Sequence, residues 1–284
     1  MSRPSRAFLA LSVIVACAPV EVPKKVVEFE VVESRASYES QAKTIAVERF
    51  EPKAEGKYPV VLVLHGAGGM TLGGPAFREF GRLLARHGYV AHVVHYFELT
   101  DTEIAGLPAM RANFSSWMKA ISDGITNASK QPNVDPDRVG LLGFSLGSYL
   151  SLSLATFDPR VSVVVEYFGG LPTEIARDFK SLPPVLILHG DADKIVPITE
   201  ADTLEKVFKE KSVSYEKRIY AGQGHGFTGE DGEDAARRAV AFFERHLRSR
   251  AAPNKARETL KSIDEARFKP EEQLRTGDEL RRRP

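Results

Sequence analysis

Residues 138–148 read Arg-Val-Gly-Leu-Leu-Gly-Phe-Ser-Leu-Gly-Ser, and this segment decides the fold. Its apolar first half predicts a buried strand, and the Gly-Phe-Ser-Leu-Gly sequence after it predicts a sharp turn into a helix. The Asp-Pro-Asp turn at residues 135–137 starts the strand, and the apolar residues 149–155 continue the helix. The segment therefore has the strand–turn–helix setting of a nucleophile elbow, with Ser145 at its tip.

The elbow explains why glycines flank this serine. A serine raised on so sharp a turn sits in strained backbone, and we expect that only glycine fits at Gly143 and Gly147 without a clash. Ser145 also precedes the helix, where free N–H groups favour developing negative charge. The Leu146 N–H is therefore a candidate oxyanion donor. A tight turn without chemistry is the alternative, because so short a motif recurs by chance.

Length and composition limit the classes of protein to consider. A chain of 284 residues can bury one large core and often remains a single domain in α/β proteins. The 39 basic and 38 acidic residues nearly cancel, so the charge gives no reason to expect a nucleic acid partner. The single cysteine, Cys17, lies in the N-terminal leader, so the folded body has no disulfide and no thiol nucleophile.

The N-terminus has the pattern of an export signal. Arg3 and Arg6 precede an apolar run at residues 7–16, which is too short to span a membrane but has the length of a secretory signal core. We therefore expect the chain to be exported.

Residues 14–17, Ile-Val-Ala-Cys, resemble the bacterial lipoprotein box. The resemblance implies that Cys17 is lipidated and becomes the N-terminus of a membrane-anchored protein facing the periplasm or the cell exterior. The alternative is cleavage after Ala18, which would release a secreted protein, although the following Pro19 disfavours that cut. Residues 1–17 are thus the expected signal, and residues 18–26 are a linker.

Strand and helix patterns alternate through the body of the chain. Residues 26–33 and 44–50 alternate apolar with polar side chains, which predicts an antiparallel outer pair. Residues 58–64 are continuously apolar, as expected of a strand covered on both faces. Further strands are expected at residues 89–95, 161–166, 185–189 and 214–220, and helices at residues 77–87, 108–130, 199–208 and 233–247. This order predicts an α/β fold with a mostly parallel, twisted sheet and helices on both faces.

Two further regions complete the domain organisation. Fewer than ~20 residues connect the strand ending near residue 166 to the next, which leaves no room for a large lid and predicts an open, shallow site. We expect one catalytic domain over residues 27–249. About half of residues 250–284 carry charge of mixed sign, which predicts a partly disordered or helical tail.

Acid and base candidates follow two later strands. Residues 189–197, HGDADKIVP, leave a strand at its carboxyl end, where open α/β sheets bind their ligands. Asp193 or Asp191 could accept the Nδ1 proton of a histidine and stabilise the imidazolium. His225 follows the last strand, and its neighbours Gly224 and Gly226 free the loop to bring the ring over the elbow.

The chain order serine, aspartate, histidine is that of α/β-hydrolase triads. Residues 65–69, His-Gly-Ala-Gly-Gly, follow the third strand, where this class places its second oxyanion donor, and we favour the Ala67 N–H. These glycines lack the Gly-Lys-Ser/Thr of a phosphate loop and the acidic residue of a dinucleotide site, so we expect no cofactor. The other histidines lack the spacing and carboxylate partners of a metal site.

These motifs together resemble the dienelactone hydrolase family over roughly residues 27–247. The resemblance rests on His65-Gly66, on residues 135–147, on G-x-x-D-x-x-V-P at residues 190–197 and on Gly-His-Gly-Phe at residues 224–227. It implies that Asp193, which precedes x-x-Val-Pro, is the triad acid. The founding members carry a cysteine at the elbow, whereas Ser145 makes this chain similar to serine members that hydrolyse carboxylic esters.

The expected function is therefore a serine hydrolase that cleaves small-molecule carboxylic esters or lactones through an acyl-enzyme. The alternatives are a peptidase or acyltransferase on the same fold, and a membrane-tethered binding protein that kept the scaffold without turnover.

Overall fold

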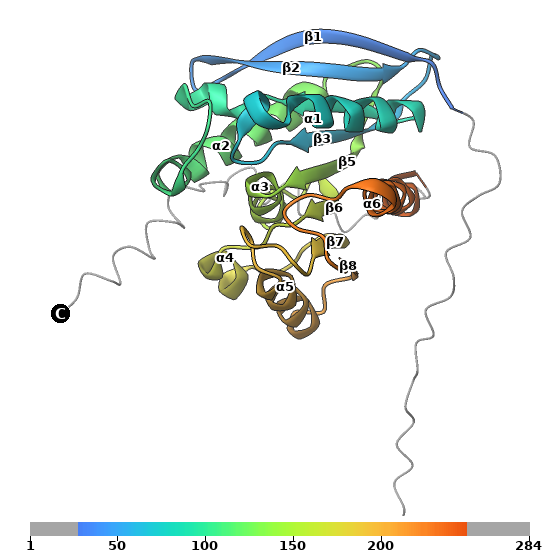
Figure 1. The fold of residues 1–284 in the computed structure, drawn as a ribbon. Helices are drawn as coiled ribbons and strands as arrows, with labels where there is room; N and C mark the ends of the chain where they lie inside the picture. The colour runs from blue at the N-terminus through green and yellow to red at the C-terminus, as the bar shows by residue number, and fades with distance from the viewer. Residues whose placement is uncertain (1–27, 249–284) are drawn as a thin grey trace, which may run out of the picture.

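The computed structural model describes residues 28–248, which form an eight-stranded sheet in the order β1-β2-β4-β3-β5-β6-β7-β8 (Figure 1). β1 and β2 pair antiparallel at one edge, β2 also pairs antiparallel with β4, and the remaining neighbours are parallel. The mostly parallel sheet predicted from the sequence is therefore confirmed. The strands are β1 (Val31–Ser40), β2 (Lys43–Pro52), β3 (Tyr58–Leu64), β4 (Val90–Val94), β5 (Val134–Phe144), β6 (Val161–Tyr167), β7 (Val185–Gly190) and β8 (Tyr215–Tyr220).

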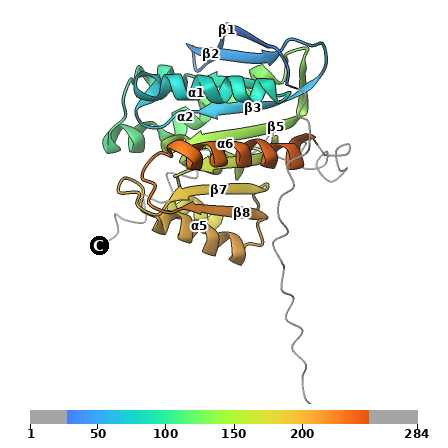
Figure 2. The ribbon, with the colours of Figure 1, turned by 45° about the vertical axis from the view of Figure 1, so that its right-hand side comes forward.

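Helices cover both faces of the sheet, as predicted (Figure 2). One face carries α1 (Gly69–Arg86) and α6 (Gly229–Phe243), which continues into the π-helical turn η2 (Glu244–Arg248). The other face carries α2 (Leu107–Ala128), α3 (Leu146–Ala155), α4 (Thr173–Asp178) and α5 (Thr199–Glu210). A short 3₁₀ helix, η1 (Tyr96–Thr100), leads from β4 towards α2.

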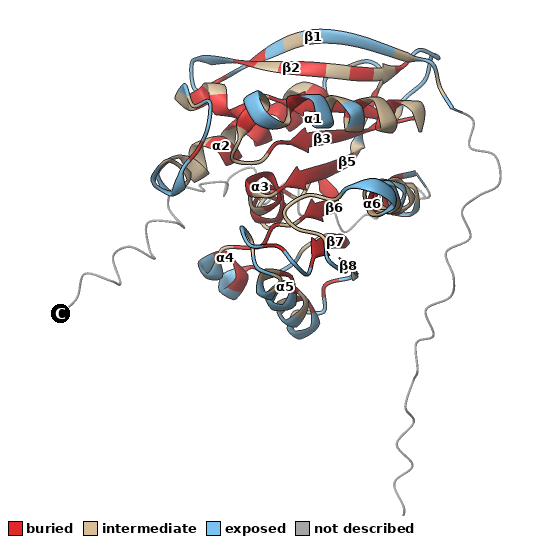
Figure 3. Ribbon diagram, viewed as in Figure 1, coloured by how far each residue is buried: buried red, intermediate tan, exposed pale blue. Residues whose placement is uncertain are grey.

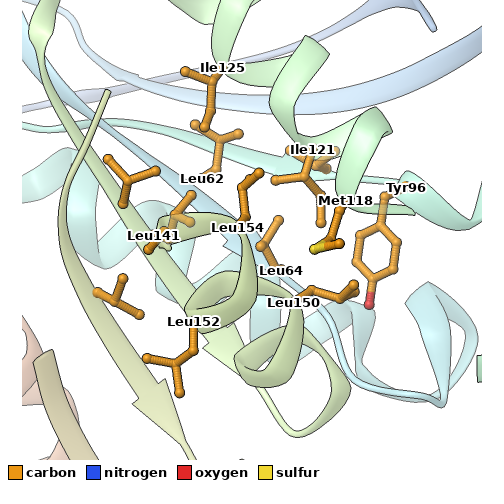
Figure 4. Close-up of a cluster of buried hydrophobic side chains, with 14 of the residues drawn as sticks. Leu62, Leu64, Tyr96, Met118, Ile121, Ile125, Leu141, Leu150, Leu152 and Leu154 are labelled. Atoms are coloured by element: carbon orange, nitrogen blue, oxygen red, sulfur yellow. The ribbon is translucent and has the colours of Figure 1, made fainter. Parts of the chain in front are cut away.

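Alternate residues of the central strands supply two separate cores. Leu62 and Leu64 of β3 pack with residues of α2 and α3 on one face (Figure 4), and Val61 and Val63 pack with residues of α1 and α6 on the other. Successive side chains of a strand point to opposite faces, and helices cover both faces here. Both sets are therefore buried, and the strand reads as a continuous apolar run. Figure 3 shows the resulting band of buried residues through the middle of the sheet.

The first strand differs from its predicted position. The two outer strands do pair antiparallel, but β1 runs from Val31 to Ser40 instead of over residues 26–33. Gln41 and Ala42, both with positive φ, close a tight hairpin that no glycine marks in the sequence. Since most β1 side chains are exposed, the strand lacks the apolar alternation on which the prediction relied.

Helix α1 begins at Gly69, well before the predicted start at residue 77. Its glycines and Pro75 look like loop residues in the sequence, but small residues are needed here for close packing. A side chain at Gly69, the first residue of the helix, would collide with the Glu103 carbonyl.

The connection from β6 to β7, residues 168–184, contains a single helix, the six-residue α4. No large lid is present within residues 28–248, as predicted. No helix in that range has both the length and the apolar character needed to cross a membrane. The predicted export signal, Cys17, the linker up to residue 26 and the charged tail fall in residues 1–27 and 249–284, outside the described residues.

Candidate active site

Ser145 occupies a strained turn between β5 and α3. Its φ of 53° and ψ of −116° lie in a region that residues other than glycine rarely adopt. Such strain costs roughly 1–3 kcal/mol and persists only where the surrounding structure holds it. The Ser145 N–H donates to the Tyr167 carbonyl of β6 at 2.9 Å, and the Ser148 hydroxyl donates to the Gly143 carbonyl at 2.7 Å. These bonds hold the turn from both sides.

The glycines around Ser145 are required by space. A side chain at Gly143 would collide with the Gly147 carbonyl, and one at Gly147 would collide with the Leu64 carbonyl at the end of β3. The prediction that only glycine fits these two positions is confirmed. A Cβ at Gly66 would lie 3.3 Å from the Ser145 Cβ, so the loop after β3 also passes directly beside the serine.

One chain of hydrogen bonds joins the three predicted site residues. His225 Nε2 lies 2.9 Å from Ser145 Oγ, and His225 Nδ1 lies 2.7 Å from Asp193 Oδ2. A carboxylate only accepts, so Nδ1 carries the proton and Nε2 is free to accept the serine proton. Asp191, the alternative acid, is exposed and accepts the Gly222 N–H at 2.6 Å instead. The structure thus places Asp193, and not Asp191, against the histidine.

Asp193 is buried but well supplied with donors. Its Oδ1 accepts the N–H groups of Ile195 and Val196 at 2.8 and 2.9 Å, which leaves Oδ2 for His225. Burial alone would raise the pKa of the Asp193 carboxyl, but the hydrogen bonds from His225 and the two N–H groups outweigh it and hold that pKa below its usual value. The carboxylate is therefore ionised at neutral pH.

Two unused backbone donors flank the serine. The Gly66 carbonyl accepts His65 Nδ1–H at 2.9 Å, and the Ala67 carbonyl accepts the Ala105 N–H at 2.8 Å. Since C=O and N–H point in opposite directions across a trans peptide, the first bond fixes the direction of the Ala67 N–H. Within residues 28–248 neither the Ala67 nor the Leu146 N–H has a hydrogen-bond acceptor.

His65 serves this loop as a neutral ring. It is buried and stacks on Tyr96 with ring centroids 4.0 Å apart. Burial lowers the pKa of His65 to about 3, so its single proton resides on Nδ1, where Gly66 accepts it. His65 therefore orients the loop beside Ser145.

Aromatic side chains line the other side of the serine. Phe168, whose backbone has φ 43°, lies 4.8 Å from the His225 ring and 5.4 Å from the Phe227 ring. Phe168, Phe227 and Met70 are partly exposed, whereas Tyr96, Phe97, Phe144 and Tyr167 are buried in the two cores. The sequence alone cannot separate these two groups, because both read as apolar residues near strand ends.

Glu166 was missed by the sequence reasoning, although it is the only charged residue in the β6 segment VSVVVEY. It is completely buried, and its Oε2 accepts the Gly169 N–H at 2.8 Å. Its Oε1 has no hydrogen-bond partner among the described residues. Burial raises the pKa of Glu166 to about 8, so the side chain is protonated at neutral pH. Glu166 thereby holds the loop that carries Phe168.

Among the described residues, no group of three or more His, Cys, Asp or Glu side chains is arranged to hold a metal ion.

An eight-stranded, mostly parallel sheet with helices on both faces and a serine on its strand–helix turn defines an α/β-hydrolase. The family model described as "Dienelactone hydrolase family" matches residues 45–250, and the chain belongs to this family. It is therefore a carboxylic ester hydrolase, of the type that acts on esters or lactones.

Individual relatives agree with this assignment. A Synechocystis protein, provisionally named carboxymethylenebutenolidase, is 28% identical over 200 residues, which cover 62% of this chain and 78% of the relative. Two crystal structures have the same fold at 18% identity, each over 76% of this chain and 99% of the other. One is a dienelactone hydrolase from Anabaena variabilis (TM-score 0.65). The other is P91, a dienelactone hydrolase-like promiscuous phosphotriesterase from metagenomic libraries (TM-score 0.67).

The burial of Glu166 predicts a pH-dependent stability. Its pKa is about 8 in the folded protein against 4.5 when exposed, so the folded state keeps a proton that the unfolded state releases between these values. This group therefore makes the free energy of unfolding fall as pH rises from about 4.5 to about 8, by up to about 1.4 kcal/mol per unit. Glu166→Gln mimics the protonated form and should be more stable than wild type at pH 9 but similar at pH 4.

Urea unfolding at pH 4, 6, 8 and 9 measures this difference. Glu210→Gln, which changes an exposed carboxylate at the end of α5, is the control and should give a pH-independent difference from wild type. A Glu166→Gln protein whose stability relative to wild type is the same at all four pH values would contradict the prediction.

Proposed function

We propose that this protein hydrolyses carboxylic esters or lactones through an acyl-enzyme on Ser145, with His225 as the base and Asp193 as the acid that orients it. The observation that carries the proposal is the unbroken hydrogen-bond chain from Asp193 Oδ2 through both nitrogens of His225 to Ser145 Oγ. The relative's name supports cyclic esters among the substrates, because a butenolide is an unsaturated lactone.

In the proposed acylation step, His225 Nε2 takes the Ser145 proton as Oγ attacks the carbonyl carbon. The ionised Asp193 stabilises the imidazolium that forms and keeps the ring in position. The Ala67 and Leu146 N–H groups donate to the oxyanion, since both are free of other acceptors and lie beside Ser145. His225 then protonates the leaving oxygen.

Deacylation repeats these steps with water. The water occupies the place of the departed alcohol, His225 Nε2 removes its proton, and the hydroxide attacks the acyl carbon held by Ser145. The same two N–H groups stabilise the second oxyanion, and the proton returns to Ser145 as the acid is released.

His189 holds the loop that carries Asp193. The ring is buried at the end of β7, and its Nε2–H donates to the Val196 carbonyl at 2.8 Å. The same nitrogen lies 3.7 Å from Asp193 Oδ2. Burial lowers the pKa of His189, so the ring is neutral and does not compete as a cation with His225. Because Val196 also donates its N–H to Asp193, His189 positions the acid through this loop.

Replacing the members of the hydrogen-bond chain should abolish turnover. We expect Ser145→Ala and His225→Ala to lower kcat for p-nitrophenyl acetate by roughly 10⁴-fold or more, and Asp193→Asn to lower it by about 10⁴-fold through the wrong histidine tautomer. Asp191→Asn keeps an acceptor for Gly222 and is the matched control, with activity near wild type.

A fluorophosphonate probe should label wild type but not Ser145→Ala. Full turnover by the Ser145→Ala protein would contradict the proposed nucleophile, and loss of activity in Asp191→Asn alone would reverse the assignment of the acid.

Removing the support of His189 should slow turnover without weakening substrate binding. His189→Phe loses the donor to Val196, and we expect kcat to fall by roughly tenfold with KM little changed, since the acid acts on the transition state. His189→Gln keeps an N–H donor on a side chain of similar reach and should recover most of kcat. Equal losses in the two variants would show that the bond to Val196 is not what positions Asp193.

We further propose that the chain is exported and anchored through a lipid on Cys17, as its N-terminal sequence indicates. The full chain expressed in a Gram-negative bacterium should then sediment with membranes and incorporate radiolabelled palmitate. Cys17→Ala should abolish the label and release the protein from the membrane fraction. A wild-type protein that carries no label and fractionates in the same way as Cys17→Ala would contradict the anchor.

A further inference from the structure

The most exposed large apolar side chains gather on the edge of the sheet that carries Ser145. Four of the five within residues 28–248 lie in segments that follow β3, β4 or β7 at their carboxyl ends, and only Val32 lies on the outer strand β1. Their exposed fractions are 70% for Leu72, 56% for Ile104, 68% for Leu107, 72% for Ile195 and 43% for Val32. Single exposed apolar residues need no explanation, but a group beside a reaction centre does.

Three of these residues border the loop that supplies the Ala67 N–H. A Cβ at Gly68 would lie 2.9 Å from the Leu72 side chain, so Leu72 rests against this loop. The Ala105 N–H donates to the Ala67 carbonyl at 2.8 Å, which places its neighbour Ile104 along the same loop.

Leu107, two residues after Ala105, is the first residue of α2. We call Leu72, Ile104 and Leu107 the aliphatic rim. A Cβ at Gly66 would lie only 3.3 Å from the Ser145 Cβ, so the loop that Leu72 and Ile104 border also passes beside Ser145.

The chemistry of the proposed reaction sets the direction of the substrate. The leaving oxygen must lie beside His225, because that ring protonates it, and the carbonyl oxygen must face the Ala67 and Leu146 N–H groups. The remaining substituent of the carbonyl carbon, the acyl chain, therefore points away from His225. The aliphatic rim adjoins the loop of Ala67, whereas Phe168, with Phe227 against it, lies beside the His225 ring and therefore beside the leaving group.

We propose that the preferred substrates are esters with a medium- or long-chain aliphatic acyl group, whose chain lies along Leu72, Ile104 and Leu107. This inference rests on the proposed function and adds the class of acyl group. An aliphatic chain laid on the rim removes apolar surface of both partners from water, and each further methylene covered adds to the gain. Ile195 belongs to the loop after β7, where it donates its N–H to Asp193, and is not part of the rim.

A chain-length series with one constant alcohol tests the proposal. The substrates are p-nitrophenyl acetate, butyrate, hexanoate and octanoate, all below their critical micelle concentrations, with Ser145→Ala as the background. For wild type we expect kcat/KM to rise about tenfold from the acetyl to the octanoyl ester. The triple variant Leu72→Ser, Ile104→Ser, Leu107→Ser should lose this rise while retaining wild-type activity on the acetate.

Val32→Ser and Ile195→Ser are the controls, since each removes an exposed aliphatic side chain outside the rim. Both should retain the tenfold rise. A flat series in wild type, or an undiminished rise in the triple variant, would overturn the proposal while hydrolysis of the acetate still upheld the proposed function. Loss of hydrolysis of every ester would instead count against the proposed function itself.

Sedimentation velocity on the same proteins distinguishes another occupant of the rim. We expect wild type and triple variant to have the same sedimentation coefficient. A wild-type dimer that becomes monomeric in the triple variant, with the chain-length series unchanged, would show that the rim is an interface between copies and would overturn the proposal.

Discussion

The close approach of α3 to the ends of β3 and β5 is the constraint on which the rest of the site depends. Gly147 packs against the Leu64 carbonyl and Gly143 against Gly147, so the helix begins with no space between it and the sheet. The chain can make this connection only by forcing Ser145 into positive φ, which turns its hydroxyl outward. The same tight packing brings the loop after β3, with its Ala67 N–H, against Ser145. The packing of the backbone therefore brings Ser145 and the Ala67 N–H together.

The surroundings of Asp193, Glu166 and His65 decide which of these buried groups is charged. Asp193 is buried but surrounded by donors, so its carboxylate stays ionised. Glu166 is buried with a single N–H donor and an oxygen without a partner among the described residues, so it stays protonated. His65 is buried and neutral. Asp193 accepts three hydrogen bonds, whereas Glu166 is more deeply buried and accepts one, so the first carboxyl group is ionised and the second is neutral.

Sequence reasoning predicts those parts of this protein that depend on local pattern or on the topology of a parallel sheet. Ser145, Asp193 and His225 could be placed together because each follows a strand, and the carboxyl ends of parallel strands meet at one edge. The continuous apolar strand β3 was predicted to the residue for the same reason of pattern. β1 and the start of α1 were not, since one is mostly polar and the other glycine-rich. The roles of His65 and His189 depend on ring orientation, and that of Glu166 depends on burial by distant segments. Neither property follows from the spacing of residues in the sequence.

The brevity of the connection between β6 and β7 has a consequence for the size of substrate. This connection, residues 168–184, contains a single helix, the six-residue α4. We therefore expect that an ester carried on a bulky body, such as a polymer end, can present its carbonyl to Ser145 while the remainder stays in solvent.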